Sequence, residues 1–210
     1  MRLNKAVKRA KENLLYHLVA STAMLAESTP LFVAFETQVA GMTNEVSLNT
    51  RLSIVSLTYL GLGYVYGLGR RYLRRAFGIT EESRETKQTL HDTIYTATFN
   101  ALISPPLYLI AGETDLEKIV IGTLCATGFG SINGSPLGYA VDSLEDLTSL
   151  KECNRPSYPA FLKKMNSKVK YGLAILLVTG SIGITSWVYS INPNKNNRPQ
   201  VTSEAKHKDK

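Results

Sequence analysis

Cysteine and histidine are scarce in this chain of 210 residues, which has two cysteines and three histidines. Cys125 lies in an apolar run and Cys153 in a polar loop, so neither a disulfide framework nor metal-ligand spacing is present. The histidines are scattered, and the sequence contains no nucleophile–base pair and no phosphate-cradling loop. We therefore expect no catalytic residue, no metal, no cofactor and no enzymatic activity.

The sequence also lacks an RNA-binding signature and any interleaving of aromatic with basic residues, although its net charge is +7. The basic residues instead flank long apolar stretches, which is where membrane proteins carry them. This placement excludes nucleic acid as the expected partner and makes a lipid bilayer the expected one.

Five apolar runs with few or no charges are what the sequence does contain. They cover residues 14–40, 52–69, 93–111, 119–141 and 171–191. The last four are each about 18–23 residues long, enough to cross a hydrocarbon core of roughly 30 Å. They do not alternate as barrel strands do, so they are helices. The predicted fold class is an all-α membrane protein, a polytopic helical bundle of four core transmembrane helices plus a fifth C-terminal one.

These runs divide the chain into parts with different expected roles. Residues 1–13 are a cytoplasmic basic tail, 14–145 a four-helix membrane core, 146–170 a cytoplasmic loop, 171–191 an additional transmembrane helix and 192–210 a disordered polar tail. The small residues from Ser21 to Ala26 also fit a signal-peptide cleavage site. We prefer a first membrane helix, because apolar residues resume after Glu27.

Lysine and arginine are distributed unevenly among the segments between the runs. They gather in 1–13, 70–91 and 142–170, whereas the other two loops contain one each, Arg51 and Lys118. The positive-inside rule then predicts a multi-pass protein of the cytoplasmic (inner) membrane with a cytoplasmic N-terminus. Five spans place the C-terminus outside. The basic C-terminal tail fits that side less well, so a four-span topology stays open.

Ionisable residues at membrane depth are costly and by default indicate function. Four carboxylates and one arginine are our candidates for proton coupling or gating: Glu27, Glu36, Asp92, Asp142 and Arg51. Arg51 is expected to pair with Glu36 or with Glu45. Structural alternatives stay open, namely a helix cap for Asp92, an interfacial charge for Asp142 and an outer-loop position for Glu36.

Glycines recur at every fourth position in the fourth run, at Gly130, Gly134 and Gly138. On one continuous helix they would share a face and let another helix approach closely. That face is either a seam for self-association, a sliding contact in a transport cycle or ordinary packing within one bundle. Pro136 is expected to kink this helix.

Two consecutive prolines, Pro105 and Pro106, lie in the third run. Each removes a backbone donor, so we expect the third helix to break near its middle. Backbone groups freed inside a membrane protein usually face a cavity or a neighbouring helix.

Several short motifs resemble the bacterial L-alanine exporter family over about residues 18–145. The family's Glu, Gly-Met-Ser/Thr, Glu, Ser and Arg-Leu are similar to residues 36–52, and its Tyr-Gly and Arg to Tyr66-Gly67 and Arg70. Asp92 with Thr98-Phe99, Gly134 with Gly138-Tyr139 and Asp142, and Ala23-Met24 also match in order. Ala20 stands where the family has an aspartate, and neither the fifth run nor the tail has a counterpart.

The resemblance implies a four-helix inner-membrane exporter that is driven by the proton gradient, as an antiporter is, and that associates with itself. We therefore expect export of L-alanine or a similar small neutral amino acid. A homo-oligomer is also expected, because so few helices would enclose little on their own. The alternative is a non-transporting membrane scaffold or small regulatory subunit.

Overall fold

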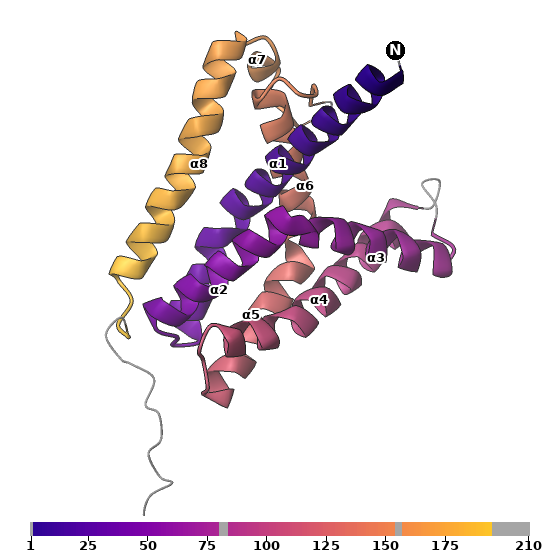
Figure 1. The fold of residues 1–210 in the computed structure, drawn as a ribbon. Helices are drawn as coiled ribbons and strands as arrows, with labels where there is room; N and C mark the ends of the chain where they lie inside the picture. The colour runs from indigo at the N-terminus through magenta and orange to yellow at the C-terminus, as the bar shows by residue number, and fades with distance from the viewer. Residues whose placement is uncertain (1, 80–83, 154–156, 195–210) are drawn as a thin grey trace, which may run out of the picture.

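The computed structural model describes residues 2–79, 84–153 and 157–194. Within these parts the fold is all-helical (Figure 1), as the sequence predicts, and no strand occurs among them. The polar tail expected to be disordered lies, from residue 195 on, outside the described residues.

Eight α-helices and two π-helical turns make up the described chain. They are α1 (Arg2–Ala34), η1 (Phe35–Val39), α2 (Asn44–Leu57), η2 (Thr58–Leu62), α3 (Gly63–Ala76), α4 (Glu85–Ile110), α5 (Leu116–Ile132), α6 (Gly134–Leu147), α7 (Ala160–Lys163) and α8 (Ser167–Ser190). The basic segment 2–13 is helical and continuous with the first apolar run.

Two of the predicted membrane helices are interrupted. The second run changes direction at Gly61, whose φ of 117° is open to glycine but strained for other residues. The fourth run is divided at Asn133 into α5 and α6. Pro136 lacks the N–H that would bond to the carbonyl of Ile132, so its predicted disturbance of this helix is confirmed as an interruption.

The predicted break at Pro105 and Pro106 is wrong, because α4 continues through both prolines to Ile110. Both lie near the end of the helix, where few further backbone bonds depend on them. One turn later, Tyr108 is 1% exposed and packs between α4 and α5. Packing against α5 therefore keeps this last turn helical.

Among the residues that the structure describes, two segments are long and apolar enough to cross a membrane, Arg9–Val39 and Ser167–Ser190. Only 17% and 11% of the residues in their apolar windows are buried, whereas the core helix of a soluble protein is mostly buried. Of the other predicted spans, the second and fourth are divided at Gly61 and Asn133, and α4 is more polar.

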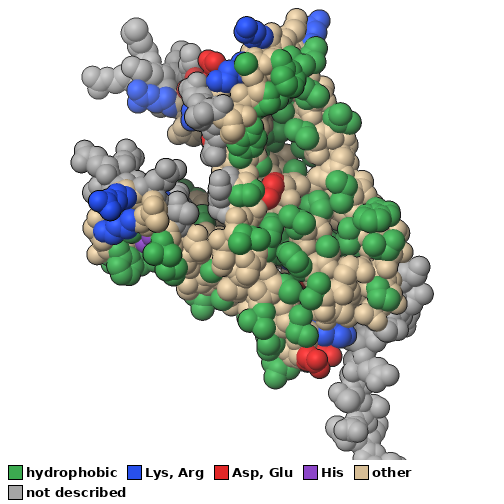
Figure 2. Space-filling model, turned by 180° about the vertical axis from the view of Figure 1, so that it is seen from behind, with side chains coloured by type: hydrophobic (Ala, Val, Ile, Leu, Met, Phe, Trp, Pro, Cys, Tyr) green, Lys and Arg blue, Asp and Glu red, His purple; other side chains and the backbone are tan. Residues whose placement is uncertain are grey.

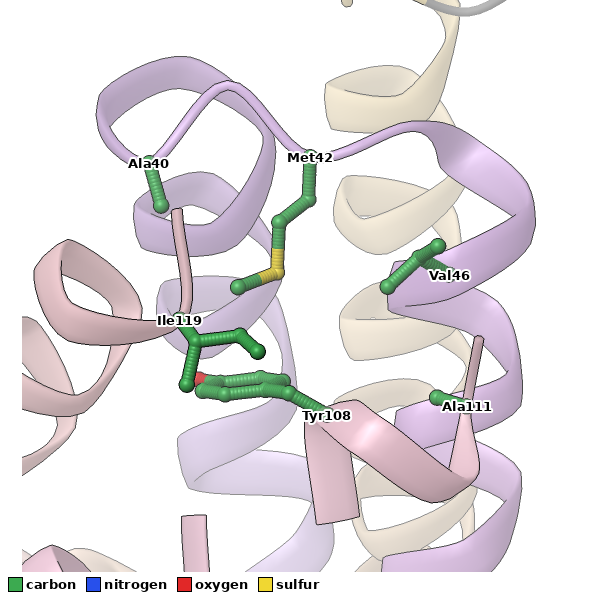
Figure 3. Close-up of a cluster of buried hydrophobic side chains, with 6 residues drawn as sticks. All are labelled: Ala40, Met42, Val46, Tyr108, Ala111 and Ile119. Carbon is green, nitrogen blue, oxygen red and sulfur yellow. The ribbon is translucent and has the colours of Figure 1, made fainter. Parts of the chain in front are cut away.

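The two ends of the helix bundle differ in how tightly they are packed. At one end, which we call the closed end, the turns after η1, α4 and α8 lie together (Figure 1). A cluster of buried side chains joins the turns after η1 and α4 to α2 and α5, and it consists of Ala40, Met42, Val46, Tyr108, Ala111 and Ile119 (Figure 3). The Met42 side chain points from its turn toward the ring of Tyr108.

At the opposite end, which we call the open end, the start of α1, the end of α3 and α7 are spread apart (Figure 1). Figure 2 shows the surface deeply indented between the arm that contains α3 and the start of α1. The bundle is therefore packed shut at one end and spread at the other.

Helix α8 is an integral part of the fold and packs on α1 and α6. Ala174 of α8 joins Ala23, Leu144 and Leu147 in a second buried cluster. Pro30 removes the donor that would bond to the carbonyl of Ala26 within α1, and Ser181 of α8 donates to that carbonyl at 2.6 Å instead. The fifth helix thus satisfies a backbone group that the first leaves open.

Candidate functional site

A cavity of about 700 Å³ lies between α1, α2, η2, α3, α4, α5 and α6. It extends from Thr50, Arg51 and Tyr108 at the closed end to Asp92 and Asp142 toward the open end. The exposed fraction of the lining side chains changes along this path. Thr50 and Tyr108 are each 1% exposed, whereas the Asp92 side chain is 21% exposed. The lining is therefore fully buried at the closed end and partly exposed toward the open end.

Helix α4 contributes a stripe of polar side chains along the whole cavity. Its members occur at every fourth position and all line the cavity: Asp92, Thr96, Asn100, Ser104 and Tyr108. Residues four apart share one helix face, so the stripe is continuous from one end to the other. Sequence reasoning missed this stripe, although the spacing is visible in the sequence.

A buried charge pair occupies the closed end. Glu36 is fully buried, its carboxylate pairs with the guanidinium of Arg51, and Ser47 Oγ donates to Glu36 Oε2 at 2.6 Å. The Arg51 guanidinium carbon also lies 4.8 Å from the centre of the Phe32 ring. Of the two partners that the sequence left open for Arg51, the structure places Glu36 there and not Glu45.

Local backbone geometry aims these groups at one another. The π-helical turn closes with a bond from Ala40 N to Phe35 O at 2.8 Å, and such turns are frequent at functional sites. Thr43 then caps α2 by accepting from Val46 N at 3.3 Å. Ser47 and Arg51 are four residues apart, so both face Glu36 from α2. An outer-loop position for Glu36 is therefore wrong.

Toward the open end, Asp92 forms a two-pronged pair with Arg74 of α3. Arg74 Nε donates to Asp92 Oδ1 at 2.9 Å, and the second prong joins Nη2 to Oδ2. His91 Nδ1 lies 3.2 Å from Oδ1. Asp92 is seven residues inside α4, so the alternative that it caps the helix is wrong.

Asp142 lines the same cavity from α6. The fourth apolar run ends just before Asp142, but the helix continues to Leu147. Asp142 is therefore inside the helix rather than a charge beyond its end.

Glu27 lies behind the cavity wall instead of lining it. Its Oε2 accepts from Asn133 Nδ2 at 3.0 Å, and Asn133 is 8% exposed and lines the cavity. Because Asn133 is the residue that separates α5 from α6, Glu27 fastens α1 to this interruption. The sequence pointed to Glu27 as a charged group but gave no sign of its partner.

The predicted glycine stripe does not lie on one continuous helix, because Asn133 separates Gly130 on α5 from Gly134 and Gly138 on α6. A Cβ at Gly130 would overlap the side-chain amide of Asn100. Gly130 therefore allows α5 to pack against α4 within the chain. Gly138 lines the cavity, and Gly134 is the first residue of α6.

Beyond the fourth apolar run, a second polar cluster fastens α8 to the end of α6. Asp146 Oδ2 accepts from Lys170 Nζ and from Tyr158 Oη, each at 2.9 Å. Burial acts to raise the pKa of the Asp146 carboxyl, but these bonds and one from Cys153 N outweigh it and hold the pKa below its usual value. Burial also raises the pKa of neighbouring Glu145.

Comparisons with known proteins add no relative to this geometry. No family model, no curated protein and no solved structure matches the chain. The resemblance to L-alanine exporters therefore stays a prediction, and the cavity has to carry the functional argument.

Proposed function

We propose that this chain is a multi-pass protein of the cytoplasmic membrane that exports L-alanine or a similar small neutral amino acid, driven by the proton gradient. In this proposal α1, α2 with α3, α4, α5 with α6, and α8 each cross the bilayer. The observation that carries the proposal is the cavity of about 700 Å³, with its polar stripe on α4, closed at Arg51 and open near Asp92.

The arrangement of the loops supports the expected topology. The start of α1, the end of α3 with Arg74 and Arg75, and α7 with Lys163 lie at the open end. These are the basic segments, so the positive-inside rule assigns the open end to the cytoplasm. The cavity then faces the compartment from which an exporter takes its substrate.

The two ion pairs beside the cavity suit a zwitterion better than an ion of one sign. Arg51 is paired with Glu36 and Arg74 with Asp92, so neither pair leaves a net charge. Arg51 keeps one buried donor, Nε, without a hydrogen-bond partner. A substrate carboxylate at the closed end would satisfy that donor, while the α4 stripe offers hydroxyl and amide groups along the path.

The residues that line this cavity belong to one chain, and the homo-oligomer stays an expectation. Self-association would have to rest on other surfaces than Gly130, which packs against α4.

Proteoliposomes loaded with labelled alanine test the proposal. Efflux should depend on an imposed proton gradient, and Asp92→Asn should abolish it because the variant loses the charge that faces Arg74. Glu117→Gln, an exposed carboxylate outside the cavity, is the matched control and should export normally. Identical leakage with and without protein would contradict export and leave the non-transporting scaffold.

A further inference from the structure

Helix α8 ends beside the charge pair at the closed end, although no described residue of α8 lines the cavity. Asn44 Nδ2, at the start of α2, donates to Tyr189 O at 3.0 Å. Asn192 Nδ2 donates to Met42 O at 3.1 Å and to Asn44 Oδ1 at 2.7 Å. Asn194 Nδ2 donates to Gly41 O at 3.3 Å. We call these contacts, together with the one between Tyr189 and Ser47, the C-terminal clasp.

The clasp is connected directly to the charge pair. Tyr189 Oη lies 3.2 Å from Ser47 Oγ, and Ser47 Oγ donates to Glu36 at 2.6 Å. A hydroxyl has one hydrogen to donate, and Ser47 uses its hydrogen on Glu36. Tyr189 must therefore be the donor to Ser47, so a chain of hydrogen bonds runs from α8 to the buried carboxylate.

The clasp and the charge pair span the same boundary. Arg51, Ser47 and Asn44 lie on α2, whereas Glu36 follows α1 in η1 and Tyr189 lies on α8. Helix α8 is held to α1 elsewhere, since Ser181 donates to Ala26 O. Movement of α2 away from α1 would therefore break the Glu36–Arg51 pair and the clasp together.

We propose that α8 is a built-in restraint on the closed end, and that the C-terminal clasp must release before the cavity opens on that side. This inference rests on the proposed function, because export through the cavity requires its closed end to open. Within the described chain, the side-chain hydrogen bonds that join α8 or its C-terminal turn to α2 or the turn before it all belong to the clasp.

Accessibility of a buried cysteine tests the restraint without any substrate. The background is the full chain with Cys125→Ser and Cys153→Ala, and the reporter is Thr50→Cys, because Thr50 is 1% exposed at the closed end of the cavity. A membrane-impermeant maleimide is added to either side of the membrane in separate samples. Combining the reporter with Tyr189→Phe and Asn192→Ala removes three hydrogen bonds of the clasp. It should raise the labelling rate from the C-terminal side about a hundredfold, since each lost hydrogen bond shifts an equilibrium about fivefold.

The matched control is Ser190→Ala, whose hydroxyl bonds only to the carbonyl of Trp187 in its own helix. It should leave the labelling rate unchanged. Equal rates in the control and in the clasp variant would overturn the proposal.

A crosslink provides the opposite perturbation on an otherwise intact chain. In the same background without the reporter, Asn44→Cys and Asn192→Cys are joined by a short reducible bifunctional thiol reagent. Alanine efflux should stop on crosslinking and return on reduction, and undiminished efflux from the crosslinked protein would overturn the restraint. If no variant exports alanine but the clasp variant still labels faster than the control, the restraint is supported and the proposed substrate is wrong.

Discussion

Glu36 and Arg51 form an ion pair in which the exposed fractions of the two side chains are 0% and 11%. Removing two charges from water costs several kcal/mol each, and their attraction offsets this only when the remaining hydrogen bonds are also made. Here Ser47 supplies one such bond to Glu36, and the face of Phe32 covers the guanidinium. The closed end is therefore held by two buried charges that are tolerated as a pair, whereas either charge alone would destabilise the fold.

Breaking this pair from one side should cost more than removing it altogether. Arg51→Met should lower the free energy of unfolding by about 3–5 kcal/mol, because it leaves a buried carboxylate without a partner. Adding Glu36→Gln to Arg51→Met should recover a large part of that loss. Unfolding in mixed micelles measures the free energy of unfolding of the single and double variants. If the losses caused by the two single substitutions add up in the double variant, the two side chains do not act as a pair.

Gly130 and Gly128 should respond differently to the same added methyl group. Gly130→Ala places its Cβ against the amide of Asn100, which must move and give up its bond to Ala126 O. We expect a loss of about 1–3 kcal/mol in unfolding free energy, as for other overpacked sites. Gly128 has no atom near its added Cβ, so Gly128→Ala should be neutral or slightly stabilising.

Size measurements in detergent compare the oligomeric states of the Gly130→Ala and Gly128→Ala variants. Both variants should keep the oligomeric state of the parent chain, because Gly130 contacts α4 of its own chain. A change of state in Gly130→Ala alone would mean that this glycine also lies in a contact between chains.

The sequence predicted the helices better than it predicted their interruptions. Charge-free length marks a helix because backbone groups must be satisfied within it, and all five runs are helical or nearly so. Gly61 and Asn133 interrupt two of these helices. Pro105 and Pro106 do not interrupt α4, because the packing of the end of this helix outweighs the local preference of proline against a helix.

Among candidate site residues, the sequence found the charges and offered Glu36 as one of two partners for Arg51. It did not point to the partners of Asp92 and Glu27. Arg51, Glu36, Asp92 and Asp142 could be selected because charge is conspicuous in an apolar run. The partner of Glu27, Asn133, lies 106 positions away in the sequence, between α5 and α6, and no local pattern points to it. The polar stripe on α4 was visible from spacing alone and shows that period-four polarity is worth counting in membrane runs.

Acid should weaken the attachment of α8 to α6. The folded-state pKa of Asp146 lies below its unfolded value, so its contribution to stability is complete above about pH 4, the unfolded pKa, and is lost as pH falls through the folded value. The unfolding free energy should therefore decrease from pH 6 to pH 3, and Asp146→Asn should flatten that decrease.

Glu145→Gln is the matched control for this experiment, because the pKa of Glu145 is shifted in the direction opposite to that of Asp146. Burial raises the folded-state pKa of Glu145, so its stabilisation is present at low pH and is lost as pH rises through the folded value. Glu145→Gln should thus steepen the loss of stability in acid. Identical acid profiles for the two variants would contradict the assignment of these opposite shifts.

The C-terminus should lie on the side of the membrane opposite to the N-terminus. Helix α8 is fastened at its start, where Lys170 bonds to Asp146, and after its end, where Asn192 bonds to Met42. These two attachments lie at the open and closed ends of the bundle, so α8 extends over the full length of the bundle. Two single-cysteine chains report the two sides of the membrane. One carries Lys208→Cys and the other Lys151→Cys, and both lack Cys125 and Cys153.

An impermeant maleimide should label the Lys208→Cys chain in intact cells and the Lys151→Cys chain only after permeabilisation. Labelling of both from the same side would mean that α8 does not cross the membrane, and the topology would then have four spans.

That result would also mean that the clasp does not lie on the outer side of the membrane, because Asn192 and Met42 could no longer meet at an external turn. The basic residues of the tail would in that case obey the positive-inside rule, which they oppose in the five-span arrangement. Membrane crossing by α8 therefore has to outweigh this charge bias, and its 24 helical residues without any acidic side chain are long and apolar enough to do so.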